Sequence, residues 1–249
     1  SDHASGREAA SAIAKKSGAL VAINGGYFDM SSKPAKTFSL VRRDGQTLVP
    51  NIAKINRPGR SYFVTRGAFG WNDTNLPGAL RGEAAWIAHL GDKIYAYDEP
   101  VRNTTTTSAA PPNETSPVGA REWNVENAIG GGPVLIRKNQ IVDTYENEVF
   151  FGAGFPGNSP YARAAIGITK DNQLILFATD GKQKNHSIGL TLKHLAEEMQ
   201  RLGCVEAMNL DGGGSETLVV HGEAINHPSD GRERSITSIV AVAHDVSTQ

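Results

Sequence analysis

The sequence predicts an α+β fold in which a large, curved and mainly antiparallel sheet carries two main helices. Segments with the composition of strands outnumber those with the composition of helices. Short turns join several of the strand segments, and tight hairpins make neighbouring strands antiparallel. Only residues 7–17 and 191–202 have a clear helical pattern.

Both helical stretches have recognisable ends. Residues 7–17 are mostly good helix formers, and Gly18 follows at the position that commonly ends a helix. In residues 191–202 the apolar side chains repeat on one face, Thr191 suits the N-cap, and Gly203 suits the position after the C-cap. We therefore expect helices with boundaries close to these residues.

The strands are expected from apolar or β-branched runs. They lie at residues 19–23, 37–66, 84–88, 134–136, 162–169, 174–179, 205–210, 218–220 and 234–244. Asp44-Gly45 and His221-Gly222 predict hairpin turns. Glycine, proline and small polar residues predict loops at residues 70–82, 103–122 and 151–161, the second of them a long surface excursion.

Length and composition indicate one globular domain over residues 1–249, with 39% hydrophobic and 20% charged residues. A formal net charge of -1 gives no sign of a nucleic-acid partner or a polybasic membrane surface. No apolar run approaches the roughly 20 residues that span a membrane. The chain opens at Ser1 without an initiator methionine, so we expect the mature form of an exported protein.

No cofactor and no catalytic metal are expected, although the acidic glycine turns could hold a structural calcium ion through oxygen ligands. The single cysteine, Cys204, excludes an internal disulfide and a multi-cysteine metal site, and its place at a strand start suits a small buried hydrophobe. The seven histidines show no metal-binding spacing. No phosphate-binding Walker loop or dinucleotide fingerprint is present.

The stretch from Val205 to Val220 contains the densest candidate site. An apolar run ends at Asp211 and is followed by Gly212, Gly213 and Gly214. Successive glycine N–H groups, uncovered by side chains, can form a concavity for phosphate or carboxylate oxygens. The alternative is a tight turn between two strands, capped by the aspartate.

Two further apolar runs end in glycines, at Asn24-Gly25-Gly26 and at residues 130–132, and Asp180-Gly181 ends another strand. The three glycine turns could be an internal repeat, but their flanking sequences do not match. We therefore expect them to meet at one place, where sheet proteins carry their ligands.

Three side chains are candidates for catalysis. Arg163 lies in an otherwise apolar strand, so its guanidinium is either a structural ion-pair partner or an anion ligand. Asp180 and Asp211 are either turn caps or the carboxylate pair that acid–base and glycoside chemistry needs. Ser215 lacks the closing glycine of a serine-hydrolase nucleophile elbow, because Glu216-Thr217 follows it.

Six motifs occur in a fixed order. They are Asn24-Gly25-Gly26-Tyr27-Phe28, Ile129-Gly130-Gly131-Gly132-Pro133, Arg163-Ala164-Ala165-Ile166-Gly167, Asp180-Gly181, Ser187-Ile188-Gly189-Leu190-Thr191 and Asn209-Leu210-Asp211-Gly212-Gly213-Gly214-Ser215. Together they resemble the phosphodiester glycosidase family over about residues 19–244. The resemblance implies an exported hydrolase that needs no cofactor and cleaves the glycosidic bond of a sugar-1-phosphodiester.

The resemblance also implies site roles. Arg163 and the glycine turns would hold the phosphodiester, while Asp211 and Asp180 would serve the anomeric carbon and the water or leaving group. The implied substrate-binding residues are Asn24, Gly25, Gly26, Gly131, Gly132, Lys182, Asn209, Gly212, Gly213, Gly214 and Ser215.

Some features depart from the family pattern. Relatives usually have threonine at Ala164 and arginine at Lys182, where lysine gives a point charge instead of a planar fork. Relatives also carry strands before the first helix, so we expect the first strands of the domain to be missing from this chain. Two other functions stay open: a non-catalytic sugar-phosphate or polysaccharide-binding module, and a phosphodiesterase that cuts the P–O bond.

Overall fold

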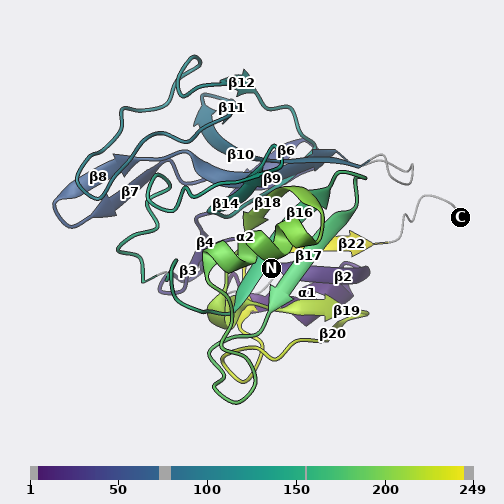
Figure 1. Cartoon of the computed structure of the whole chain (residues 1–249). Coiled ribbons are helices and arrows are strands. Elements are labelled where there is room, and N and C mark those ends of the chain that lie inside the picture. Colours follow the sequence, from purple (N-terminus) through teal and green to yellow (C-terminus); the bar gives the residue numbers. More distant parts are fainter. Residues whose placement is uncertain (1–4, 73–79, 155, 244–249) are drawn as a thin grey trace, which may run out of the picture.

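The computed structural model describes residues 5–72, 80–154 and 156–243, and it confirms an α+β fold dominated by antiparallel strands (Figure 1). Part of the expected loop at residues 70–82, namely residues 73–79, lies outside the described residues, as does residue 155 of the expected loop 151–161. Within the described ranges, the strands form three larger sheets and three two-stranded ribbons.

The seven-stranded sheet is antiparallel throughout. In spatial order its strands are β12 (Arg121–Glu122), β11 (Lys93–Tyr97), β10 (Arg81–Leu90), β9 (Arg66–Asn72), β13 (Asn127–Gly130), β5 (Val41–Arg43) and β6 (Gln46–Val49). Between β11 and β12, residues 98–120 contain no helix or named strand, which matches most of the loop expected at 103–122, but the last two residues of that loop form β12 instead.

The other two large sheets are also antiparallel. The five-stranded sheet has the order β15 (Gln140–Ile141), β14 (Val134–Arg137), β18 (Cys204–Asn209), β16 (Arg163–Thr169) and β17 (Leu174–Thr179). The four-stranded sheet has the order β20 (Glu223–Ala224), β19 (Leu218–Val220), β2 (Ala19–Asn24) and β22 (Ile239–Ala243).

The remaining elements are short. The ribbons pair β1 (Glu8–Ala9) with β21 (Ser235–Ile236), β3 (Phe28–Asp29) with β4 (Lys36–Thr37), and β7 (Lys54–Arg57) with β8 (Arg60–Phe63). The helices are α1 (Ala10–Lys16), α2 (Leu192–Arg201) and a 3₁₀ turn, η1 (Gly213–Ser215). Among the described residues, no helix combines the length and the apolar character needed to cross a bilayer.

The core joins the three large sheets. Phe69 and Trp86 of the seven-stranded sheet pack with Ile166 and Met208 of the five-stranded sheet, and Ile23 adds the four-stranded sheet. Helix α2 covers the opposite face of the five-stranded sheet, and α1 packs on the four-stranded sheet (Figure 1). Each sheet therefore buries an apolar face against another element, as the α+β prediction requires.

Local signals in the sequence are largely confirmed. Thr191 caps α2 by accepting a hydrogen bond from the N–H of His194 (3.1 Å). The Asp44-Gly45 turn joins β5 to β6, and His221-Gly222 joins β19 to β20, with positive φ at all four residues. Cys204 is buried, which raises the pKa of its thiol to about 11 and suits the expected inert role.

The sequence prediction is wrong about where the first helix begins. Helix α1 begins at Ala10, because Glu8 and Ala9 pair with Ile236 and Ser235 as a short ribbon. Long-range backbone pairing thus overrides the helix propensity of these first residues.

One buried carboxylate ties two of the sheets together. Oε2 of Glu148 accepts a hydrogen bond from the N–H of Gly67 (2.8 Å) on β9. Its Oε1 accepts from Trp86 Nε1 (3.0 Å) on β10, from the N–H of Val134 (3.0 Å) on β14, and from Thr144 Oγ1 (2.7 Å). Glu148 is fully buried, so these four donors must replace its hydration.

We expect Glu148→Gln to lower the free energy of unfolding by about 3 kcal/mol, because an amide cannot accept on both of its ends and leaves a buried donor unpaired. Urea denaturation measures the change. Glu146→Gln is the matched control, since Glu146 is exposed and accepts one hydrogen bond, from the N–H of Thr105. Equal losses of unfolding free energy in the two variants would contradict the role of Glu148 in linking the two sheets.

Candidate functional site

A cavity of about 540 Å³ lies where the three glycine turns meet. The N–H of Asp211 donates to the carbonyl of Gly25 (3.2 Å), and the N–H of Gly132 donates to the carbonyl of Asn209 (2.8 Å). Asn24 Nδ2 donates to the carbonyl of Asp211 (2.7 Å). The structure therefore brings together the three turns that the sequence analysis expected to meet.

Two of the implied substrate-binding residues hold these turns in place. Asn24 is buried, and its Oδ1 accepts from the N–H of Thr217 (3.1 Å). Asn209 is also buried, and its Nδ2 donates to Tyr27 Oη (2.8 Å) and to the carbonyl of Gly132 (2.9 Å). Neither residue belongs to the cavity lining, so both position the turns that surround it.

The glycines allow close approach between backbones. A Cβ on Gly26 would meet the carbonyl oxygen of Gly130, and one on Gly212 would lie 2.5 Å from the carbonyl oxygen of Ala162. Of the implied substrate-binding glycines, Gly131 and Gly212 line the cavity. The structure places Gly25, Gly26, Gly132, Gly213 and Gly214 outside its lining.

Three N–H groups of the turn that follows Asp211 donate hydrogen bonds within the protein. The N–H of Gly212 donates to Asp211 Oδ1 (2.9 Å), that of Gly213 to the carbonyl of Ala162 (2.9 Å), and that of Ser215 to the carbonyl of Gly212 (3.2 Å). Two of the three glycine amides expected to face an anion, those of Gly212 and Gly213, therefore donate within the protein, and an anion site at this turn stays a prediction.

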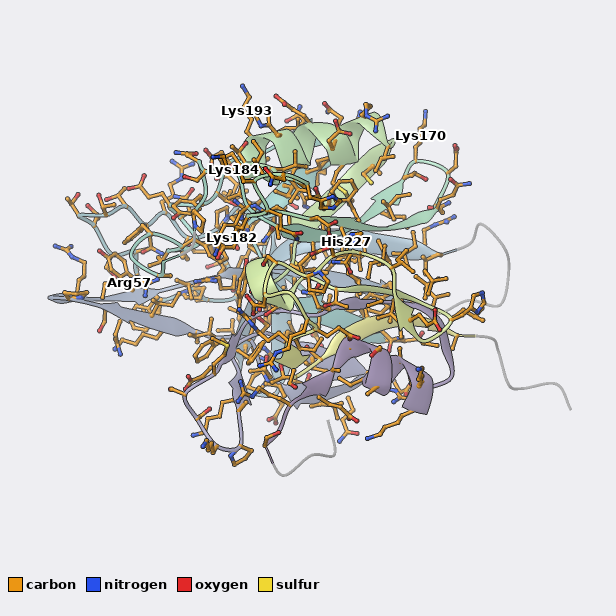
Figure 2. All side chains as sticks on the ribbon, turned by 90° about the horizontal axis from the view of Figure 1, so that it is seen from below. Arg57, Lys170, Lys182, Lys184, Lys193 and His227 are labelled. Atoms are coloured by element: carbon orange, nitrogen blue, oxygen red, sulfur yellow. The ribbon has the colours of Figure 1, made fainter. Side chains whose placement is uncertain are left out.

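Cationic side chains line the cavity instead. Lys54 and Arg57 come from the β7–β8 hairpin, which projects from the body of the molecule, and Figure 2 shows Arg57 near that hairpin. Arg66 comes from the start of β9, and Arg234 comes from the loop before β21. Among the described lining residues, Asp211 is the only one with an acidic side chain. The charge of the cavity therefore favours an anionic ligand.

Arg66 has the most buried of these guanidinium groups. Its Cζ lies 3.8 Å from the centre of the Phe150 ring, and its Nη2 donates to the carbonyl of Val149 (3.4 Å). Burial lowers the pKa of Arg66 to about 10, while the charge of Glu148 opposes that shift. Its Nε is buried and has no hydrogen-bond partner among the described residues, so the guanidinium is not fully satisfied by the protein.

Asp211 is the candidate reacting carboxylate. Burial raises its pKa to about 6, opposed by hydrogen bonds from the Ser215 hydroxyl and the Gly212 N–H and by the charge of Arg234. Arg234 is itself held by Asp230, whose Oδ2 accepts from Nη2 (2.7 Å) and Nε (3.0 Å). A carboxyl group that titrates near neutral pH in a cleft suits acid–base or nucleophilic catalysis.

Arg163 is bound to backbone carbonyls next to the cavity. It is fully buried, and its Nε donates to the carbonyl of Leu190 (3.0 Å). Its Nη2 donates to the carbonyls of Pro156 and Ser159. These contacts hold the loop after residue 155 against β16, and Arg163 is not among the cavity-lining residues. The structure thus favours a structural position for Arg163.

Asp180 lies outside the cavity lining as well. Its carboxylate accepts from His186 Nε2 (2.7 Å), from the N–H of His227 (2.8 Å) and from Asn226 Nδ2 (3.3 Å). The same Asn226 nitrogen donates to Glu216 (2.8 Å), a buried residue whose pKa is raised to about 8 by burial and by the charge of Asp180. The structure does not bring Asp180 and Asp211 together on one cavity wall, so a shared role stays a prediction.

Lys182 is the other basic residue that the sequence analysis singled out. It is exposed, and its Nζ lies 3.3 Å from Tyr161 Oη and 4.7 Å from the centre of the Tyr161 ring. Tyr161 does line the cavity. Lys182 therefore contacts a lining residue but is not itself part of the cavity lining.

Sequence reasoning missed Arg57 and Arg66. Arg66 carries the same signal that drew attention to Arg163, a lone arginine at the start of an apolar strand. Arg57 lies at a Pro-Gly hairpin turn, where a basic side chain is usually just solvated. Only the folded arrangement shows that both face the cavity.

A cavity with these charges suits an anionic ligand that lies against a single carboxylate. The chain belongs to the phosphodiester glycosidase family, whose model matches residues 17–243. This match confirms the resemblance seen in the ordered motifs.

Curated relatives are similar over part of the chain. The N-acetylglucosamine-1-phosphodiester alpha-N-acetylglucosaminidase of Mus musculus is 35% identical over 108 residues, which are 43% of this chain and 20% of the mouse protein. The enzyme of the same name from Homo sapiens is 34% identical over 108 residues, with the same shares covered. The matched region thus spans about a fifth of the length of these relatives.

Solved structures share the fold. The catalytic domain of the zebrafish enzyme of that name, auto-inhibited by its pro-peptide, has a TM-score of 0.64 and 22% sequence identity. The alignment covers 97% of this chain and 69% of the zebrafish chain. An exported protein from Burkholderia pseudomallei has a TM-score of 0.61 and 18% identity, covering 98% of this chain and 69% of that one.

We expect Asp211→Asn to stabilise the protein at pH 7.5 and to have little effect near pH 4. Because folding raises the pKa of Asp211 from 3.8 to about 6, the folded state binds its proton more tightly, and stability falls as pH rises through this window. Removing the charge therefore raises the free energy of unfolding at pH 7.5 by at most about 3 kcal/mol.

The measurement is the melting temperature of both proteins from pH 4 to pH 7.5. Asp143→Asn is the control, because Asp143 is exposed. A constant difference between wild type and Asp211→Asn across the range would contradict the raised pKa.

Proposed function

We propose that the protein is a hydrolase that cleaves the glycosidic bond of a sugar-1-phosphodiester. The observation that carries this proposal is the cavity charge: four cationic side chains and one carboxylate line it among the described residues. Such a cavity suits a substrate with an anionic phosphodiester next to an anomeric carbon. Family membership supports the same reaction class.

N-acetylglucosamine is the sugar to test first, since the mouse and human relatives are named for a phosphodiester of that sugar. We also propose that the protein is exported, as the similar Burkholderia protein is described to be.

The reaction can be assigned to groups on the cavity wall. Arg57, Arg66 and Arg234 contact the phosphodiester oxygens. Ionised Asp211 supports positive charge at C1, either directly or through the attacking water. The bond from C1 to the bridging oxygen breaks, that oxygen leaves with the phosphate, and the water oxygen ends on the sugar.

The leaving group makes this small set of residues sufficient. A phosphomonoester has a second pKa near 6, so it departs far more readily than a sugar alcohol. Stabilisation of the growing negative charge by arginines then replaces part of the general-acid catalysis that ordinary glycosidases need.

The test is turnover of an N-acetylglucosamine-1-phosphodiester in ¹⁸O-labelled water. We expect the label in the sugar, because water attacks C1. Label in the released phosphate would instead show a phosphodiesterase that cuts the P–O bond. Binding of the intact diester without turnover would identify a binding module.

Asp211→Asn should retain binding and lose turnover by about 10²–10⁴-fold, because an amide can neither take a proton nor carry the charge that supports C1. For the wild type, kcat/KM should fall as pH drops through about 6, where burial has placed the Asp211 pKa. Single-turnover rates and a pH profile provide the measurement. Wild-type rates in the folded variant would refute the assignment.

Asp180→Asn in the same assay shows whether Asp180 takes part. If the two aspartates act as a unit, each single change costs nearly as much as both together. If Asp180 acts only on the loops around it, its variant keeps the wild-type dependence on pH.

Arg66→Lys should lower kcat/KM by about 30- to 1,000-fold, a transition-state cost of about 2–4 kcal/mol, because lysine keeps the charge beside Glu148 but loses the planar fork that binds phosphate. Arg163→Lys is the comparison, and in the fraction that folds it should keep the wild-type KM. Steady-state kinetics with melting temperatures decide between them. An unchanged kcat/KM in folded Arg66→Lys would remove Arg66 from the substrate site.

A further inference from the structure

A second cluster of ionisable side chains lies outside the cavity lining. Asp180 follows β17, His186 lies six residues further along the same loop, and His227 lies on the loop after β20. Asp180 Oδ2 is 2.7 Å from His186 Nε2 and 3.3 Å from His227 Nδ1. The ligand atoms of all three residues lie within 4.8 Å of one another.

Hydrogen bonds to Oδ1 and to the backbone carbonyl of Asp180 fix the orientation of its carboxylate. Its Oδ1 accepts from the N–H of His227 (2.8 Å) and from Asn226 Nδ2 (3.3 Å), and the Asp180 carbonyl accepts from Ser187 Oγ (2.6 Å). Oδ2 is left facing both imidazoles, whose ring centres lie 4.7 Å apart. Hydrogen bonds of this kind orient carboxylates that bind metals.

A buried carboxyl group lies next to this cluster. Glu216 is fully buried, and its Oε1 has no hydrogen-bond partner among the described residues. Its Oε2 shares the Asn226 nitrogen with Asp180. Asp180 and Glu216 thus share one amide donor, which links the cluster to a buried carboxyl group.

We propose that Asp180, His186 and His227 bind a zinc ion. Two imidazole nitrogens and one carboxylate oxygen are a typical zinc donor set, whereas calcium and magnesium prefer oxygen ligands alone. Ligand atoms around tetrahedral zinc lie about 3.4 Å apart, close to the distance from His227 to Asp180.

The side chains have the freedom that binding requires. The His186 side chain is 49% exposed and that of His227 is 72% exposed, so the shorter contact of His186 can lengthen and water can take the fourth position. Figure 2 labels His227 apart from Lys182 and Lys184. Bound zinc would join the loop after the five-stranded sheet to the loop after the four-stranded sheet.

The histidine spacing in the sequence could not show this site. His186 and His227 are 41 residues apart and lie on loops of two different sheets. The expectation that the histidines form no metal site therefore rested on local sequence motifs alone.

The test uses the whole chain, freed of metal with a chelator and titrated with zinc chloride at pH 7.5 in a calorimeter. We expect one zinc per chain and a higher melting temperature with zinc but not with calcium. Cobalt in place of zinc should give the visible absorption of a four-coordinate site. Removal of either imidazole should weaken zinc binding by more than about tenfold.

His186→Ala and His227→Ala are the test variants, and His194→Ala is the matched control because His194 is exposed on α2. Binding should also weaken at pH 5.5, because protons compete with zinc for nitrogen ligands. The proposal is overturned if zinc does not bind stoichiometrically, or if the double variant H186A/H227A binds it as the wild type does. These readouts do not depend on turnover, so they are independent of the proposed hydrolase activity.

Discussion

The buried charge of Glu148 is the constraint on which both the core and the cavity depend. Its carboxylate accepts hydrogen bonds from β9, β10 and β14, so it links the seven-stranded sheet to the five-stranded sheet. The same charge offsets that of Arg66, a buried arginine of the cavity wall. A buried guanidinium without such a partner would be very costly. The packing of the sheets and the anionic preference of the cavity are thus linked through one side chain.

The fold class, the second helix and the hairpin turns could be predicted because their causes are local. Thr191 caps α2 by its own side chain, and the Asp44-Gly45 turn needs only two residues with positive φ. The meeting of the glycine turns was also predictable, since glycines after buried strands mark close backbone approach. The start of α1 was not, because the pairing of Glu8 with Ile236 depends on a strand more than two hundred residues away.

The charged side chains of the site show the limit of sequence reasoning most clearly. Arg66 and Arg163 carry the same pattern, a lone arginine at the start of an apolar strand. One enters the cavity over the Phe150 ring, and the other turns to the carbonyls of a loop. The two arginines differ in the identity of the segments that pack beside them in the folded chain. That identity arises only when distant segments come together, as it does for His186 and His227.

In the proposed reaction the cavity binds the transition state better than the substrate for a simple electrostatic reason. A phosphodiester carries one negative charge, whereas the departing phosphomonoester approaches two. The arginines of the wall therefore gain interaction energy as the C1–O bond lengthens, and an interaction that strengthens along the reaction raises kcat. Asp211 complements them at the other end of the breaking bond, where positive charge grows on the sugar.

The burial of Asp211 weakens folding near neutral pH, so the protein gives up some stability to keep this carboxylate beside the cations. The same arginines must also hold the product tightly, which makes release of the phosphomonoester the step that a more cationic cavity would slow.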